Sequence, residues 1–276
     1  MVDGINSKVG QQIRQLTVIG DQIRDLQTQI STGKKLLRPS DDIIASARIA
    51  QLRRSQAANE SWRTNLDLSK SMNSQAQTNV GSASDQVARL SELLIRAVSE
   101  QGTAQDRATI ANEIRNIAAT LDELSAVRSS LGEPLFATSE ALAVRIGSDT
   151  TIVPVPTRAE IFDMGGQSIS DIIRGYADAV ENDDDAAVNA AIAAADDIVT
   201  HFADANGKLG LVAQRIDRLG EGLIARNYDI SDELSGLADT DLSEAIAKLN
   251  QQTLTLNAAQ AAFARINSRT LFDLLS

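Results

Sequence analysis

Apolar residues recur every seven positions along the first part of the chain. The series consists of Val2, Val9, Leu16, Ile23, Ile30 and Leu37, with Ile13, Ile19 and Leu26 at intermediate positions. Steps of three and four place these side chains on one narrow stripe of a helix, which is typical of a coiled-coil seam. The positions between them are mostly Gln, Asp and Arg. We therefore expect an N-terminal helix that needs a partner to cover its stripe.

The end of the chain carries a matching pattern, with Leu242, Leu249, Leu256 and Phe263 seven residues apart and Ile246, Thr253 and Ile266 near the complementary positions. We expect the two terminal helices to pair and to bury further surface in an assembly. The alternative is that each stripe is ordinary intramolecular core. The predicted assembly residues are Val9, Ile13, Leu16, Ile23, Leu26, Ile30, Leu242, Leu249, Leu256, Phe263 and Ile266.

Between the termini the pattern predicts long helices. Gly33 suits a helix C-terminus, and Ser40 is a candidate N-cap after Pro39. A second helix should run from about Ser40 to about Gln101, interrupted only near residues 81–82. A third should follow Thr103, with an apolar stripe that extends to Leu131.

The segment after the third helix has a different character, because three of the four prolines lie between residues 132 and 166. Alternation in 142–146 and 150–153 predicts a β-hairpin that turns at 147–149. Helices resume at about 168–180 and from about 188 to 228 or beyond, and a boundary at 238–241 precedes the last one. The predicted fold is mainly α, a long antiparallel helical rod with terminal coiled-coil helices and a small β-containing insertion.

These elements suggest five domains. Residues 1–38 and 239–276 are the terminal assembly helices, residues 39–134 and 167–238 are the two halves of the rod, and residues 135–166 are the small outer insertion. Aromatic residues make up only 3% of the chain, which fits long helices with thin interfaces.

Composition excludes several functions. The net charge of −11 argues against nucleic-acid binding, which depends on clustered Lys and Arg. The absence of cysteine removes disulfides and thiolate chemistry. We expect no membrane span, since no apolar run approaches about 20 residues. The N-terminal residues also lack the pattern of a secretory signal peptide.

Candidate chemical sites are few. The acidic run Asp183–Asp185 lacks the Gly and Glu spacing of an EF-hand loop, so we interpret it as a helix start. His201 is the only histidine, and no nucleophile or orienting carboxylate stands at a useful spacing, so we interpret it as structural. The glycines at 207, 210, 220 and 222 match no phosphate-binding loop. We therefore expect no enzyme activity, no cofactor and no metal.

With the helices placed, three segments resemble the bacterial flagellin superfamily. The first is Ser-Thr-Gly-Lys at 31–34 followed by Arg-Pro-Ser-Asp-Asp at 38–42, which is similar to the turn and paired-aspartate helix start of that family. The second is Gly-Glu-Pro-Leu-Phe-Ala at 132–137, and the third is the ending Thr-Leu-Phe-Asp-Leu-Leu at 270–275. The residues of these segments are most similar to those of the hook-filament junction proteins of the superfamily.

The resemblance implies a structural subunit of the bacterial flagellum that joins hook to filament. It would be exported by the flagellar type III apparatus with the help of a chaperone, and would form a homo-oligomer in contact with a second junction protein and flagellin. A short or minor flagellin that forms the filament itself is the first alternative. A cytosolic coiled-coil scaffold is the second alternative.

Overall fold

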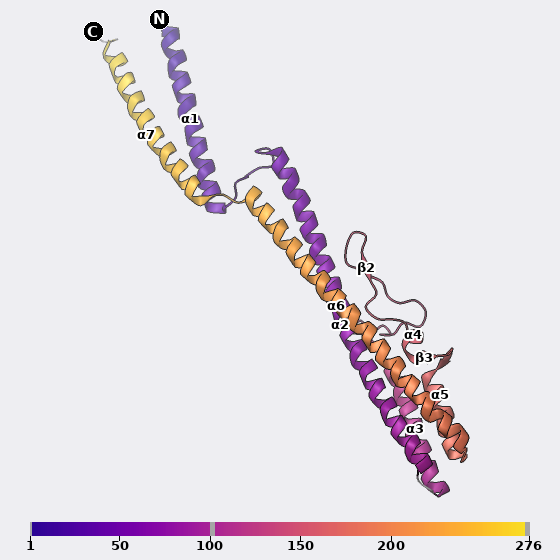
Figure 1. Cartoon of the computed structure of the whole chain (residues 1–276). Helices are drawn as coiled ribbons and strands as arrows, with labels where there is room; N and C mark the ends of the chain where they lie inside the picture. Colours follow the sequence, from indigo (N-terminus) through magenta and orange to yellow (C-terminus); the bar gives the residue numbers. More distant parts are fainter. Residues whose placement is uncertain (1, 100–102, 274–276) are drawn as a thin grey trace. The chain divides into compact units, whose positions relative to one another are not determined.

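The computed structural model describes the backbone of residues 2–99 and 103–273 and the side chains of residues 10–99 and 103–265. The described residues form a mainly α fold, as predicted (Figure 1). The helices are α1 (Val2–Thr32), α2 (Ile43–Ser99), α3 (Ala104–Ser125), α4 (Arg158–Phe162), α5 (Ile169–Glu181), α6 (Asp185–Ala238) and α7 (Leu242–Asp273). The strands are β1 (Val144–Arg145), β2 (Thr151–Ile152), β3 (Asp163–Met164) and β4 (Gln167–Ser168).

The chain divides into two compact units. The first comprises Met1–Ala57 and Asn227–Ser276, and the second comprises Ala58–Arg226. Helices α2 and α6 contribute residues to both units, while α1 and α7 belong to the first. We describe each unit separately.

The core of the second unit lies among α2, α3, α5 and α6. The apolar faces of these four helices bury side chains such as Leu90, Ile114, Ile173 and Ile198 completely or nearly so. Aromatic rings cap this core toward the insertion, where Phe162 contacts both Phe136 and Phe202 in edge-to-face geometry. A few aromatic residues therefore close a core that is otherwise aliphatic.

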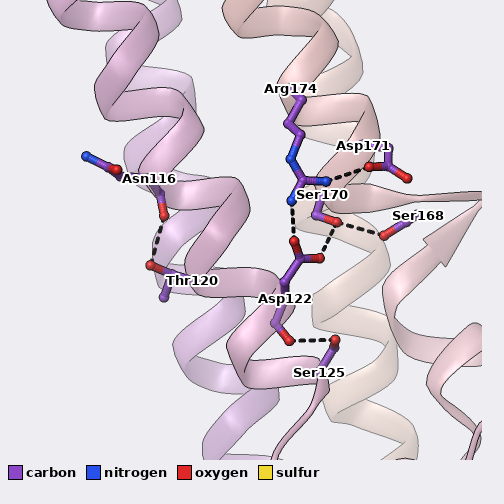
Figure 2. Close-up of polar contacts among 8 residues, drawn as sticks. All are labelled: Asn116, Thr120, Asp122, Ser125, Ser168, Ser170, Asp171 and Arg174. Atoms are coloured by element: carbon purple, nitrogen blue, oxygen red, sulfur yellow. Dashed lines mark hydrogen bonds and ion pairs between the residues drawn. The ribbon is translucent and has the colours of Figure 1, made fainter.

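Polar contacts join α3 to α5 at one edge of this core (Figure 2). The Ser170 hydroxyl donates to Asp122 Oδ1 at 2.6 Å, and Arg174 forms an ion pair with Asp122 Oδ2. Arg174 also donates to Asp171 Oδ1 at 2.5 Å, while the Ser125 hydroxyl donates to the Asp122 carbonyl at 2.8 Å. Asp122 thus serves as the acceptor that the two helices share.

Two short antiparallel hairpins lie in the insertion and directly after it. The predicted hairpin is confirmed, because β1 and β2 pair Val144 with Ile152 and Arg145 with Thr151. The β3–β4 hairpin and α4 were not predicted. Helix α4 begins with a capping box in which Thr157 and Glu160 bond each other's backbone N–H groups. This Thr-x-x-Glu spacing was a signal available in the sequence.

Two predicted helix boundaries are wrong. Helix α2 begins at Ile43, and Asp42 rather than Ser40 is its cap, since Asp42 Oδ1 accepts the Ala45 N–H at 2.9 Å. Helix α3 ends at Ser125, so Leu131 is not part of its stripe and is 60% exposed. Helix α2 also continues without interruption through residues 81–82.

Candidate assembly surface

The terminal helices α1 and α7 pack against each other in the first unit, running in opposite directions (Figure 1). Their contact follows one stripe on each helix, with steps of three and four. On α1 the stripe consists of Gln12, Leu16, Ile19, Ile23, Leu26 and Ile30, and on α7 of Ala245, Leu249, Gln252, Leu256, Ala259 and Phe263. Of these, only Ala245 is fully buried, and the others remain half-buried. Pairing therefore covers the seam only in part.

Most of the predicted assembly residues lie in this seam. They are Leu16, Ile23, Leu26, Ile30, Leu249, Leu256 and Phe263. Ile13 and Leu242 lie outside it, with 51% and 49% of their surface exposed. The side chains of Val9 and Ile266 lie outside the described residues. Whether these residues bind neighbouring subunits stays a prediction.

The sequence analysis missed the small and polar members of the seam. Ala245, Ala259, Gln12 and Gln252 hold places that the heptad spacing assigns to the stripe, although none of them is a large apolar residue. Spacing from Leu249 and Leu256 on α7, and from Leu16 on α1, was the signal that could have found them.

Further apolar side chains on both helices are not part of the seam and remain exposed. Val18 on α1 is 54% exposed, and Ile246 and Leu254 on α7 are 47% and 71% exposed. A groove of about 1130 Å³ opens between the helices. It is lined by Leu16, Val18, Ile19, Ala259, Ala262 and Phe263, together with glutamines of α1. The pair thus presents uncovered apolar surface on its faces and in its groove.

The segments that connect α1 to α2 and α6 to α7 bind each other. The Lys35 N–H donates to the Ala238 carbonyl at 2.8 Å, and the Thr240 N–H donates to the Gly33 carbonyl at 2.9 Å. Gly33 has a φ of 68°, which suits its position just after α1 and confirms the predicted helix end. Asp241 caps α7 by accepting the N–H groups of Ser243 and Glu244.

An ion pair joins the start of α2 to the end of α6 within the first unit. Arg48 Nε and Nη2 lie 2.5 and 2.8 Å from the two carboxylate oxygens of Glu233. This bidentate hydrogen bond lowers the pKa of Glu233 and raises the pKa of Arg48. Beside it, an open groove of about 670 Å³ has an apolar floor that includes Leu36, Leu37 and Ile49.

The residues considered for chemistry have structural contacts. His201 Nε2 lies 3.0 Å from the Ile161 carbonyl oxygen, which ties α6 to α4. Asp184 Oδ1 accepts the Ala187 N–H at 3.0 Å, so it caps α6 as the helix-start interpretation expects. Among the described residues, no three His, Cys, Asp or Glu side chains gather in a group that could hold a metal ion. No helix in the described part of the chain is long and apolar enough to span a membrane.

Comparison with known families gives two matches. Residues 6–141 match the bacterial flagellin N-terminal helical region, and residues 192–275 match the bacterial flagellin C-terminal helical region. No curated protein matches the sequence. The two matches leave out most of the insertion and α5.

Solved structures share the fold. A flagellar hook-associated protein from Vibrio parahaemolyticus aligns with a TM-score of 0.66 and 18% identity, over 72% of this chain and 100% of that one. FlgL from Bacillus cereus aligns with a TM-score of 0.57 and 13% identity, over 67% of this chain and 99% of that one.

Proposed function

Because the chain belongs to the bacterial flagellin family, we propose that it is a structural subunit of the flagellum that joins hook to filament. It assembles with copies of itself through α1 and α7, as helical self-assembly requires repeated contacts between identical subunits. The role is mechanical and needs no catalysis. Membership of this family argues against the alternative of a cytosolic coiled-coil scaffold.

The observation that carries the proposal is the incomplete burial of the α1–α7 pair. Leu16, Ile23, Leu256 and Phe263 stay half-buried even though the two helices are paired. Exposed apolar surface of this kind is costly in water and marks a site of protein contact. Neighbouring α1–α7 pairs would cover it, since each pair offers the same apolar faces.

The choice of junction subunit over filament subunit rests on resemblance. The two structures of similar fold are named as a hook-associated protein and FlgL. The ending Thr-Leu-Phe-Asp-Leu-Leu and the Pro-Ser-Asp-Asp segment favour the same branch of the family. The alternative is a short or minor flagellin.

The proposed role implies which proteins the subunit contacts and how it leaves the cell. One side of the assembled subunits would meet a second junction protein, and the other side would meet flagellin. Export through the flagellar type III apparatus and escort by a chaperone complete the proposal.

Deletion of the gene tests the role directly. We expect cells that carry hooks without filaments by electron microscopy, with flagellin released into the medium on immunoblots. Restoring the intact gene should restore the filaments. Filaments that persist but are shorter or altered in shape would instead identify the chain as one of the cell's flagellins.

A further inference from the structure

Helix α6 contains a stretch with weak helical preference. Four glycines stand at 207, 210, 220 and 222, and each lowers helix stability relative to alanine. A Cβ added at Gly207, Gly210 or Gly222 would meet no atom within 4 Å. Close packing therefore does not require these three glycines, and the stretch must be stabilised by its neighbours.

Neighbours are few along this stretch. Leu209 of this stretch belongs to the main core, and the rest of its apolar face meets α2 in a small separate cluster that includes Leu66 and Ile216. Helices α3 and α5 contribute no residue to this cluster. The remaining members come from the segment around β1 and β2, which supplies Val144, Ile146 and Ile152. The hairpin segment thus covers apolar side chains of α2 and α6 that the two helices alone would leave exposed.

Two asparagines of α2 donate hydrogen bonds to backbone carbonyls of the hairpin segment. Asn65 Nδ2 donates to the Arg145 carbonyl at 2.7 Å. Asn73 Nδ2 donates both to the Pro154 carbonyl at 2.9 Å and to the Leu209 carbonyl of α6 at 3.2 Å. Asn73 therefore joins α2, α6 and the hairpin segment through one amide group.

Asn73 is buried, and its whole amide group is hydrogen-bonded. It is 1% exposed, and its Oδ1 accepts a hydrogen bond from Gln77 at 2.6 Å. Both of its N–H groups and its oxygen are thus in use. Removing the amide would leave the Pro154 and Leu209 carbonyls without this donor in a buried place.

The hairpin depends on the helices in return. Its strands contain two residues each, and an isolated hairpin of this size is not stable in water. We propose that this hairpin segment, residues 142–156, is a strap that clamps the glycine-containing stretch of α6 onto α2, with Asn73 as the residue that closes it. Displacing the strap loosens the helix pair in this stretch, while the main core loses only the Val155 side chain and stays folded. The proposal does not depend on the role in the flagellum.

Hydrogen exchange measured by mass spectrometry on the full-length protein tests the strap. In Asn73→Leu we expect exchange to rise roughly tenfold in 142–156, in 58–70 of α2 and in 207–223 of α6. Exchange in α3 and α5 should stay unchanged. Ser69→Ala is the matched control, because Ser69 is equally buried in the same stretch but bonds only to the Asn65 carbonyl of its own helix. This control should match the original protein.

A second variant breaks the strap from its other side. Ile152→Asp puts a charge where Ile152, 3% exposed, contacts the cluster, and it should raise exchange in the same segments of α2 and α6. Trp62, the only tryptophan, is part of α2. The guanidinium carbon of Arg226 on α6 lies 5.5 Å from the centroid of its ring. Acrylamide should quench the fluorescence of Trp62 more strongly in both variants. The proposal is overturned if either variant exposes the hairpin and leaves α2, α6 and Trp62 as in the control, or if neither variant changes exchange in the hairpin.

Discussion

Asp122 is the residue on which the polar contact between α3 and α5 depends. It accepts from Ser170 and pairs with Arg174, while Asp171 is a more exposed second partner of Arg174. Asp122→Ala should lower the free energy of unfolding by about 1 kcal/mol, since the Asp122 side chain is partly solvated and the buried Ser170 loses its charged acceptor and keeps only the Ser168 hydroxyl as a partner.

Urea unfolding followed by circular dichroism measures this change. Asp171→Ala is the control, because the Asp171 carboxylate is 69% exposed and its removal leaves the Asp122 contacts in place. Equal destabilisation by the two substitutions would contradict the importance given to Asp122.

Asp106 illustrates how a helix cap controls an ionisation. The hydroxyl of Thr103 and its backbone N–H both donate to the Asp106 carboxylate, and these bonds lower the pKa of Asp106. Since the folded-state pKa lies below the unfolded one, the stabilisation is present above the unfolded pKa and is lost as pH falls through the folded pKa.

Thr103→Val should therefore raise the pKa of Asp106 toward its ordinary value and reduce the loss of stability on acidification. An NMR titration of the carboxyl carbon gives the pKa directly. Thr120→Val serves as the control, because the Thr120 hydroxyl bonds only to the Asn116 carbonyl within α3. A pKa in Thr103→Val as low as in the original protein would show that the hydroxyl is not responsible.

At the scale of elements, two glycines associated with α1 have opposite requirements. Gly33 ends the helix at a φ of 68°, where a side chain is strained, whereas Gly20 lies within the helix and has open space at its Cβ position. Gly33→Ala should destabilise the first unit by about 1 kcal/mol, and Gly20→Ala should stabilise α1 by about 0.5–1 kcal/mol.

Amide exchange of α1 in the two variants provides the measurement. Faster exchange in Gly33→Ala and slower exchange in Gly20→Ala are expected. Equal effects of the same sign would mean that backbone conformation does not decide the end of α1.

The helices were predictable where their signals repeat along the chain. Heptad spacing in α1 and α7 predicted both helices and most of the seam, because each apolar residue strengthens the same stripe. Their exact seam was not predictable from large residues alone, since Ala245 and Gln252 occupy places in it and the larger Leu242 does not.

Short elements and caps were harder to predict because neighbouring residues compete for the same backbone groups. Asp41 binds the N–H groups of Leu37 and Arg38 in the loop, which leaves Asp42 to cap α2. Both aspartates and Ser40 are good caps by type. Similarly, α4 is five residues long and carries no periodic pattern to detect.

At the scale of the whole molecule, the prediction concerns assembly. Leu16→Asp or Leu256→Asp puts a carboxylate into the half-buried seam of the α1–α7 pair. Either substitution should raise the concentration needed for polymerisation on the order of 100-fold, since burying an unpaired charge costs several kcal/mol. The second unit should stay folded, because its core contains neither residue.

Sedimentation and electron microscopy measure polymer formation, and circular dichroism checks the remaining helices. Leu131→Asp is the control, because Leu131 is a 60% exposed leucine in a loop of the second unit. Normal motile filaments in cells that carry Leu16→Asp or Leu256→Asp would refute the assembly role of the seam.

The two connecting segments beside Gly33 and Thr240 have a further mechanical consequence. A single strand of backbone between helices would let the terminal pair turn about its own axis by rotation of a few dihedral angles. Here two connecting segments run between the helices, and the Lys35–Ala238 and Thr240–Gly33 hydrogen bonds join them to each other. A twist of the α1–α7 pair relative to the start of α2 would have to wind both connecting segments together and break those hydrogen bonds. We therefore expect the connection to resist twisting of the terminal pair more strongly than a single connecting segment would.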